Sequence, residues 1–291
     1  MALIEKPPAG CVAGLRITVV GLGLMGGSVA KALKRGCGVT VTALGRNAAA
    51  LDAALGEGVV DRATTDADEA LGDADLTVVC LNPGPAIRFI TGNMARFKPG
   101  SVVTDICGVK RAVIDGVLPS LRSDVDFVPA HPMAGRERAG YAYSVPALFD
   151  GCNYILTPLS QNLVYSIELV KRFAGALGAG SIVLAEPEEH DRLIAFTSQL
   201  PHALAVAYVL ACGERNPLPF SAGSFRDVSR VAAINAPMWA ELFLMNRPAL
   251  LQEIMMLQEG LGRIEQLIRS GDGDGLIEEL AAAARMKEER L

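Results

Sequence analysis

The 291-residue sequence has few histidines, few charged residues and few aromatic residues. It contains three histidines, 20% charged residues and 5% aromatic residues. Three histidines argue against a histidine-rich metal site. A formal net charge of −5 argues against a general nucleic-acid binder, which needs a basic surface. Intrinsic disorder is excluded as well, because 51% of the residues are hydrophobic.

The six cysteines are scattered, and no two of them form a C-x-x-C pair. They are Cys11, Cys37, Cys80, Cys107, Cys152 and Cys212. This spacing predicts neither a zinc site nor a redox dithiol, and a chain of this length needs no disulfides for stability. We therefore expect no metal, and cysteines that mostly act as small buried hydrophobes in a reducing compartment.

The sequence also lacks a long hydrophobic segment. Residues 1–14 have no apolar core like that of a signal peptide and look like a loose tail. The longest uninterrupted apolar run, Ala203–Cys212, is too short to cross a bilayer and fits a buried helix better. We therefore expect a cytoplasmic protein that does not bind membranes.

Up to about residue 184, short apolar runs alternate with helical patterns. Strands are predicted at Arg16–Val20, Val39–Leu44, Leu76–Leu81, Ser101–Ile106, Asp126–Ala130 and Asn153–Thr157. Near-continuous apolar strands that alternate with helices are typical of a parallel sheet covered on both faces. We therefore predict an α/β domain at residues 1–184.

The pattern changes after residue 184, where no strand is predicted. Helices are predicted at residues 186–212, 224–234, 238–245, 248–270 and 275–290. Pro201 should kink the first of these helices, because proline cannot donate a backbone hydrogen bond. We therefore predict an all-helical domain at residues 185–291.

A glycine-rich turn stands between the first predicted strand and a predicted helix. It reads Gly21-Leu22-Gly23-Leu24-Met25-Gly26. In this position a G-x-G-x-x-G pattern predicts a Rossmann-like dinucleotide-binding domain. Gly21 permits the tight turn, Gly23 lets backbone approach a pyrophosphate, and Gly26 allows the helix to pack closely on the strand. We assign Gly21, Gly23, Leu24, Met25 and Gly26 to the cofactor site.

The end of the second predicted strand indicates which dinucleotide binds. Sites that prefer NAD usually carry Asp or Glu about 20 residues after the glycine turn, whereas this sequence reads Gly45-Arg46. Gly45 leaves room for a 2′-phosphate and Arg46 can pair with it, so we favour NADP over NAD. Asn82 and Pro83, which follow another predicted strand, are assigned to the same site.

Three later segments carry further polar groups. His131 follows a predicted strand, at the end where open parallel sheets bind their ligands. His202 stands four residues after Ser198 in a predicted helix. Asp227 and Arg230 lie one helical turn apart.

Together these segments resemble the prephenate/arogenate dehydrogenase family of tyrosine biosynthesis. The resemblance runs from the glycine turn to about Trp239, and its most specific part is the H-P-M-A-G-x-E segment at His131–Glu137. It implies a dinucleotide-binding domain followed by a helical domain that forms a homodimer, which the apolar stretch Leu250–Leu261 supports. It also implies oxidative decarboxylation of a small dicarboxylate, prephenate or arogenate, with hydride transfer to NAD or NADP.

The resemblance also implies roles for single residues. His131 matches the catalytic histidine, which takes the proton of the C4 hydroxyl and suits that role because imidazole titrates near neutral pH. Arg230 matches the arginine that holds a substrate carboxylate, and Asp227 would orient that arginine. The other substrate-binding assignments are Ser198, His202, Glu137 and Lys110.

Gly108 departs from the family pattern, because most members carry serine there. That serine bonds the substrate hydroxyl and the catalytic histidine. In this sequence Cys107, water or backbone makes these hydrogen bonds instead, or else the path of the proton differs. His190 is interpreted as a solvated residue at an acidic helix start, with no role.

Two other functions remain open at this point. The first is a 3-hydroxyacid dehydrogenase, which also joins a glycine-turn domain to helices but usually relies on a lysine of its helical domain. No lysine occurs from Leu184 to Ser270, which counts against it. The second is a non-catalytic NAD(P)-binding sensor. Gly108 favours a sensor, whereas His131 and Arg230 argue against one.

Overall fold

The computed structural model describes residues 2–8, 12–136 and 138–290, which form an α/β part followed by helices. Its main sheet has six parallel strands in the order β4-β3-β2-β5-β6-β7. The strands are β2 (Arg16–Val20), β3 (Thr40–Leu44), β4 (Arg62–Thr64), β5 (Leu76–Val79), β6 (Val102–Asp105) and β7 (Asp126–Phe127). Parallel strands place all their carboxyl ends at one edge, where ligands bind in such sheets.

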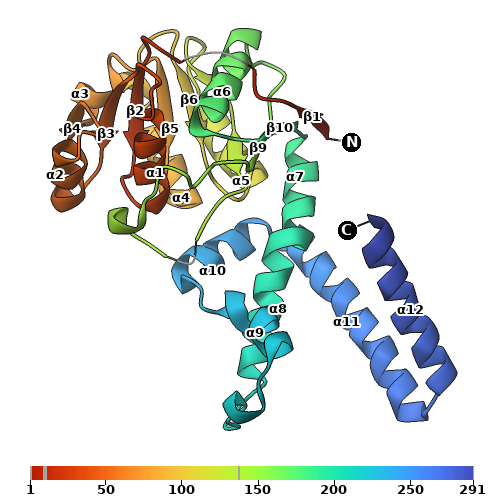
Figure 1. Ribbon diagram of the computed structural model, residues 1–291. Helices are drawn as coiled ribbons and strands as arrows, with labels where there is room; N and C mark the ends of the chain where they lie inside the picture. The colour runs from red at the N-terminus through yellow and green to blue at the C-terminus, as the bar shows by residue number, and fades with distance from the viewer. Residues whose placement is uncertain (1, 9–11, 137, 291) are drawn as a thin grey trace.

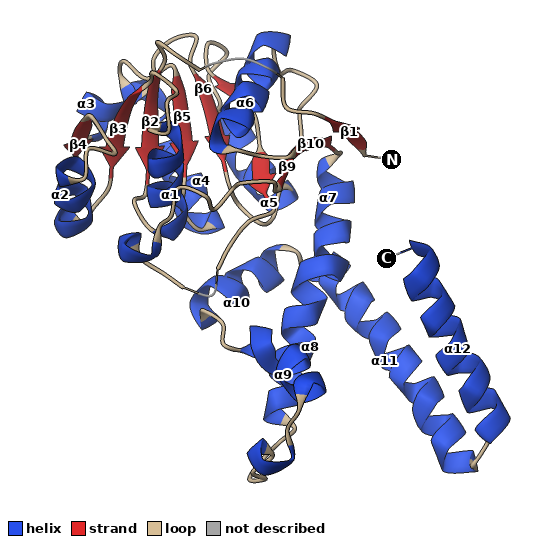
Figure 2. Cartoon of the chain, viewed as in Figure 1, coloured by secondary structure: helices blue, strands red, loops and turns tan. Residues whose placement is uncertain are grey.

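Helices cover both faces of this sheet (Figure 2). They are α1 (Leu24–Leu33), α2 (Ala48–Gly56), α3 (Ala67–Leu71), α4 (Pro83–Gly92), α5 (Arg111–Val117) and α6 (Val164–Leu177). Side chains alternate along each strand, so Val19 joins one hydrophobic cluster and Val20 joins the other.

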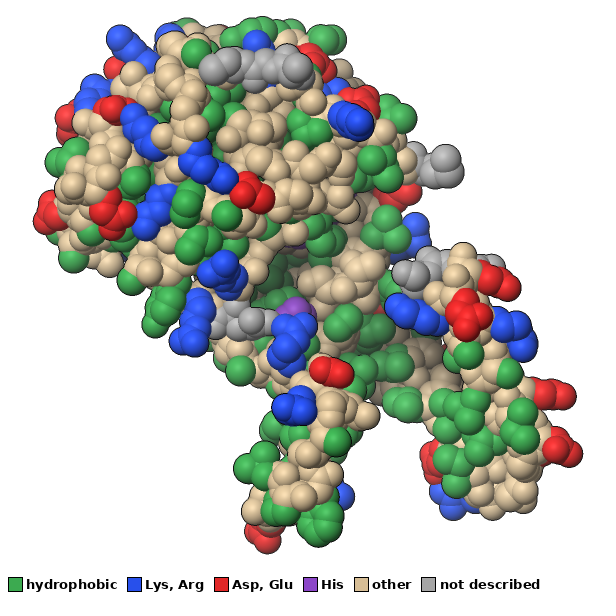
Figure 3. All heavy atoms as spheres, viewed as in Figure 1, with side chains coloured by type: hydrophobic (Ala, Val, Ile, Leu, Met, Phe, Trp, Pro, Cys, Tyr) green, Lys and Arg blue, Asp and Glu red, His purple; other side chains and the backbone are tan. Residues whose placement is uncertain are grey.

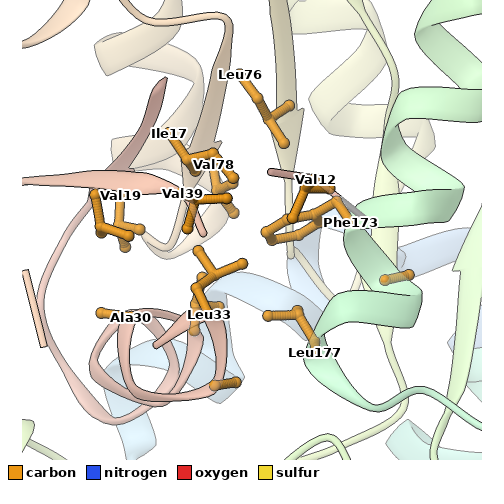
Figure 4. Close-up of a cluster of buried hydrophobic side chains, with 14 of the residues drawn as sticks. Val12, Ile17, Val19, Ala30, Leu33, Val39, Leu76, Val78, Phe173 and Leu177 are labelled. Carbon is orange, nitrogen blue, oxygen red and sulfur yellow. The ribbon is translucent and has the colours of Figure 1, made fainter. Parts of the chain in front are cut away.

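Figure 4 shows the first of these clusters. Leu33 of α1 and Phe173 of α6 pack there against strand residues such as Val78. Burial of each such side chain stabilises the fold by about 1.5–3 kcal/mol. This packing fixes the two helices on the sheet and thereby the turns at its carboxyl edge.

A second sheet, with the order β1-β10-β9-β8, corrects two expectations. Its strands are β1 (Leu3–Glu5), β8 (Ala130–Pro132), β9 (Asn153–Leu156) and β10 (Ser181–Leu184). The N-terminal segment is therefore not a loose tail, because β1 pairs with β10 and Val12 is buried. The strand predicted at Asp126–Ala130 was also wrong, because it divides into β7 and β8. Pro129 has no N–H to donate to the main sheet, and its carbonyl oxygen accepts from the N–H of Thr157, which directly follows β9.

The remaining described chain is helical and lies below and beside the α/β part (Figure 1). It comprises α7 (Pro187–Ile194), α8 (Leu200–Leu210), α9 (Gly223–Ser229), α10 (Ala236–Met245), α11 (Arg247–Ser270) and α12 (Gly273–Arg290). Helix α7 packs on α5, and α10 packs on α4. Helices α11 and α12 form a hairpin that projects away from the sheet (Figure 1).

The kink expected at Pro201 takes the form of a π-helical turn, Ala195–Gln199, between α7 and α8. Proline lacks the N–H that would bond the carbonyl four residues earlier, which lies in this turn. By length and composition, the run Pro187–Leu210 could also cross a membrane. Helix α7, which begins this run, packs on α5 of the α/β part.

The cysteines fit their expected character only in part. Cys107 is buried, whereas Cys37, Cys80, Cys152 and Cys212 are half-buried. The sixth, Cys11, lies outside the described residues.

Candidate active site

The glycine turn lies between β2 and α1 at the carboxyl edge of the sheet. Gly21 has a φ of +89°, and a Cβ there would lie 2.7 Å from the Cys80 carbonyl oxygen. A Cβ on Gly26 would lie 2.1 Å from the Gly21 carbonyl oxygen, so neither position tolerates a side chain. A Cβ on Gly23 would meet nothing within 4 Å. Neighbouring protein atoms therefore leave no room for side chains at Gly21 and Gly26, whereas the space beside Gly23 is open.

This geometry fits a dinucleotide pyrophosphate. Leu24 and Met25 form the first turn of α1, and Gly23 precedes them without a side-chain cap. Their unpaired backbone N–H groups and the positive end of the helix dipole favour an anion at this point.

The residues assigned to the ribose follow β3. A Cβ on Gly45 would lie 3.9 Å from the Leu22 nitrogen, which places Gly45 beside the glycine turn. Arg46 is exposed and forms no hydrogen bond or ion pair with the part of the chain that the structure describes. Asn47 instead caps α2 through the Ala50 N–H. Arg46 is thus the available cation at the end of β3.

The start of α4 brings the helical part to the same edge. Asn82 is exposed at the cap position, and Pro83 is buried in the first turn of α4. The backbone N–H of Gly84 donates to Oε1 of Glu241 on α10 at 2.9 Å. A carboxylate of the helical part therefore sits at a helix N-terminus of the α/β part.

His131 lies in β8 and faces Gly108. A Cβ on Gly108 would lie 3.7 Å from His131 Nε2 and 3.6 Å from Leu242 Cδ2 of α10. Residues from β8, the loop after β6, and the helical part therefore meet around this imidazole. A histidine side chain is visible in the hollow between the two parts, with basic side chains near it (Figure 3).

The prediction that His190 is a solvated bystander was wrong. His190 is 2% exposed, and its Nε2 lies 2.9 Å from His131 Nδ1. Its Nδ1 lies 2.7 Å from Asp191 Oδ1. Asp191 in turn accepts hydrogen bonds from the backbone N–H groups of Lys110 and Arg111, at the start of α5. Helix α7 thus supplies two buried polar side chains, of which His190 contacts His131 and Asp191 contacts His190.

Burial sets the protonation of both histidines. Desolvation lowers the pKa of His131 well below 6.5, and the nearby His190 and Lys110 lower it further. Burial also lowers the pKa of His190, although its hydrogen bond to Asp191 opposes that shift. Both imidazoles are therefore neutral at pH 7, and a neutral imidazole can accept a proton.

Lys110 was assigned to the substrate, but its position indicates a structural contact. The side chain is fully buried, and its Nζ lies 2.5 Å from Asp105 Oδ2 and 2.5 Å from the Ala130 carbonyl oxygen. Asp105 Oδ1 also accepts from the Ala130 N–H. This ion pair joins the end of β6 to the start of β8, so it supports the strand that carries His131.

The remaining substrate-binding assignments lie in the helical part. Ser198 is in the π-helical turn, and its carbonyl oxygen lies 2.8 Å from His202 Nδ1. The His202 ring stacks on Trp239, with ring centroids 3.8 Å apart. Asp227 is exposed on α9, and exposed Arg230 begins the turn that packs on α8.

Two further predictions concern Glu137 and metal ions. Glu137 lies outside the described residues. Within residues 2–8, 12–136 and 138–290, no group of three or more His, Cys, Asp or Glu side chains is arranged to hold a metal ion.

A helical pattern could have revealed His190 and Asp191. The buried residues of α7 are Pro187, His190, Asp191 and Ile194. These positions follow the i, i+3, i+4, i+7 spacing of a single buried helix face. Their neighbours in sequence, which are acidic, suggested a solvated segment, whereas the spacing places them inside.

Comparisons with known proteins agree with this geometry. A family model described as "Prephenate dehydrogenase, nucleotide-binding domain" matches residues 29–183, and one described as "Prephenate dehydrogenase, dimerization domain" matches residues 186–282. A cyclohexadienyl dehydrogenase of Zymomonas mobilis is 34% identical over 270 residues, which cover 90% of this chain and 91% of that protein.

Solved structures give the same result. The prephenate dehydrogenase of A. aeolicus, in complex with hydroxyphenyl propionate and NAD+, is 27% identical with a TM-score of 0.87, covering 96% of this chain and 99% of that one. The arogenate dehydrogenase of Synechocystis is 26% identical with a TM-score of 0.82, covering 95% and 100%. The predicted Rossmann-like domain with a following helical domain is confirmed, and the chain belongs to the prephenate dehydrogenase family.

Proposed function

We infer that the chain oxidatively decarboxylates prephenate or arogenate to 4-hydroxyphenylpyruvate or tyrosine, with hydride transfer to a nicotinamide dinucleotide. One observation carries this inference beyond family membership. The neutral imidazole of His131 faces Gly108 at the carboxyl edge of the sheet, at the same edge as the glycine turn. A base and a dinucleotide site at one edge are what this reaction needs.

His131 acts on one proton during the reaction. The dinucleotide supplies the hydride acceptor when it is bound, and the hydride leaves C4 of the cyclohexadienol. His131 Nε2 takes the proton of the C4 hydroxyl as the C4–O bond becomes a carbonyl. The ring carboxylate then leaves as CO₂, and its bonding electrons aromatise the ring. The resulting phenolate takes the proton back from His131, so the proton count balances.

The substrate contacts are proposed as follows. Arg230 holds a carboxylate through its planar guanidinium, and Asp227 orients it. Ser198 and His202 contact the substrate from the helical part, and Glu137 is a further substrate contact. Lys110 holds Asp105 and β8 in place, so it acts on the substrate only through His131.

For the cofactor we propose NADP over NAD. Support comes from Arg46, which is exposed and unpaired among the described residues, and from Gly45, which adds no carboxylate there. Gly21, Gly23, Leu24, Met25 and Gly26 would hold the pyrophosphate, and Asn82 and Pro83 would line the same edge.

We further propose a cytoplasmic homodimer that forms through the helical domain at residues 185–291, with the dinucleotide domain at residues 1–184. Large apolar side chains are exposed along α8 to α12: Leu210, Phe220, Leu244, Met255, Met256, Ile268, Ile277 and Leu280. Exposure on this scale marks an interaction surface, and a second copy would cover it. Sedimentation of the purified protein should therefore give twice the mass of one chain.

A direct assay tests the function. Purified protein is incubated with prephenate or arogenate and either dinucleotide, and absorbance near 340 nm is followed. We expect reduction of the cofactor with at least one of the two substrates. Turnover of a 3-hydroxyacid instead would favour the first alternative function, and cofactor binding without turnover of any substrate would favour the sensor.

A further inference from the structure

A line of hydrogen bonds runs from the start of α5 to His131. It begins at Asp191, which is 6% exposed. Asp191 Oδ1 accepts from the Lys110 N–H at 2.7 Å, and Oδ2 accepts from the Arg111 N–H at 2.9 Å. A backbone N–H can only donate, so both oxygens act as acceptors. The helix N-terminus therefore holds this carboxylate in one fixed orientation.

The fixed carboxylate determines the tautomer of His190. Because Asp191 Oδ1 is an acceptor, the proton of His190 lies on Nδ1, at 2.7 Å. A neutral imidazole carries one N–H, so His190 Nε2 has a free lone pair. Burial favours this neutral form of His190, as its lowered pKa indicates.

The same reasoning determines which ring nitrogen of His131 carries the proton. His190 Nε2 is an acceptor, so His131 Nδ1, at 2.9 Å, must donate to it. The lone pair of His131 is therefore on Nε2, the nitrogen that faces Gly108. Without such a partner a neutral imidazole exchanges between its two tautomers, and only one of them could accept a proton at this position.

We propose that His190 and Asp191 are positioning residues that hold His131 in the tautomer whose Nε2 can accept the substrate proton. The catalytic meaning rests on the proposed function, whereas the tautomer itself follows from hydrogen bonds alone. The line also stabilises the imidazolium that forms when His131 takes the proton, because Asp191 carries the compensating charge.

Nitrogen-15 NMR of the full-length protein tests the tautomer directly. Only three histidines are present, and substitution of each assigns its pair of ring nitrogens. We expect the His131 proton on Nδ1 and the unprotonated signal on Nε2 at pH 7. A wild-type spectrum with the proton on Nε2 would overturn the proposal.

Two variants test the consequence for catalysis. His190→Leu removes the acceptor for His131 Nδ1, so we expect a mixture of His131 tautomers. The kcat should fall at least about ten-fold. In serine proteases, a histidine held in the wrong tautomer lowers kcat by roughly 10⁴-fold. The Kd for the dinucleotide should not change. His190→Gln keeps an amide oxygen that can accept from His131 Nδ1, and it should restore both the tautomer and part of kcat.

Arg192→Gln is the matched control, since Arg192 is exposed on the same helix. The proposal would be refuted if His190→Leu kept the wild-type kcat and the wild-type nitrogen-15 chemical shifts of His131. If His190→Leu does not fold, His190→Gln and the wild-type spectrum still decide the question. Full activity of His131→Asn would instead refute the proposed base, without changing the tautomer measurement.

Discussion

At the scale of single residues, the three histidines have different roles because their surroundings differ. His131 has one ring nitrogen on His190 and the other towards Gly108. His202 stacks on Trp239 and is tied to the backbone of its own helix. These two histidines are thus each held by a specific partner, and substitutions can separate their contributions.

His131→Asn should lower kcat strongly while it changes the substrate KM little. Asparagine keeps a polar side chain, but it has no basic nitrogen to accept the C4 hydroxyl proton. General base catalysis typically contributes about 10²–10⁴-fold to a rate, so a loss of that size is expected. Steady-state kinetics at pH 7 gives both constants, and an unchanged kcat would remove His131 from the chemistry.

The double change Gly45→Asp with Arg46→Leu should shift preference towards NAD. A charge-assisted hydrogen bond is worth about 1.5–3 kcal/mol, which is roughly a 10- to 150-fold change in preference. The ratio of kcat/KM for NADP and NAD measures the shift. An unchanged ratio would mean that Arg46 points away from the ribose.

Gly108→Ala should be tolerated in spite of its place beside His131. The backbone there is outside the left-handed region, and the new Cβ would be in ordinary contact with Leu242 and His131 at 3.6 and 3.7 Å. Loss of chain freedom in the unfolded state should raise the free energy of unfolding by about 0.4–1 kcal/mol. Urea unfolding checks this, and a loss of stability would contradict the space seen at Gly108.

At the scale of elements, contacts between helices join the two parts of the chain. Asp191 on α7 caps α5, and Glu241 on α10 accepts from the start of α4. Both contacts place a carboxylate at a helix N-terminus, where the helix dipole favours negative charge. They hold the helical part against the edge that carries His131 and the glycine turn.

The Glu241 contact depends on Gly84, since a Cβ there would lie 2.4 Å from Glu241 Oε1. Glu241→Ala should lower the free energy of unfolding by about 0.5–1.5 kcal/mol, and by much less in a Gly84→Ala background. Gly92→Ala on the same helix is the control, because a Cβ there meets nothing within 4 Å. The changes in the free energy of unfolding caused by Gly92→Ala and Glu241→Ala should simply add. If Glu241→Ala were as strongly coupled to Gly92→Ala as to Gly84→Ala, the contact would be contradicted.

At the scale of the whole molecule, buried histidines make stability depend on pH. Burial lowers the pKa of His131 and of His190 in the folded state, whereas both titrate near 6.5 when the chain is unfolded. The charged groups that face them are Lys110 and Asp191, with Asp105 behind Lys110. Below pH 6.5 the unfolded chain therefore binds more protons than the folded chain.

The free energy of unfolding should consequently fall as pH drops below about 6.5, by at most about 1.4 kcal/mol per pH unit for each histidine. Above that pH this contribution is constant. Urea unfolding at fixed protein concentration, between about pH 5 and pH 8, measures the slope. His190→Gln should flatten it and Arg192→Gln should not, and a stability that rises towards pH 5 would refute the assignment.

Much of the fold could be predicted because its signals are local. The strand at Arg16–Val20 and the glycine turn after it appear where the sequence placed them, since apolar runs and special glycine positions depend on nearby residues. For the site, the sequence suggested His131 as a candidate base. It did not suggest its hydrogen-bonding partner His190, which stands 59 residues away in sequence.

The sequence by itself determined the alternation of strands and helices before about residue 184, the helical character after it, the glycine turn and the family, because each follows from short-range patterns. Only the tertiary structure decided that β1 pairs with β10, that the chain leaves the main sheet at Pro129, and that His190 lies inside. Those features join residues far apart in sequence, and the stability of such contacts depends on burial that exists only once the chain has folded. The hydrogen bond of His131 is therefore a property of the packed molecule, because its partner His190 comes from helix α7.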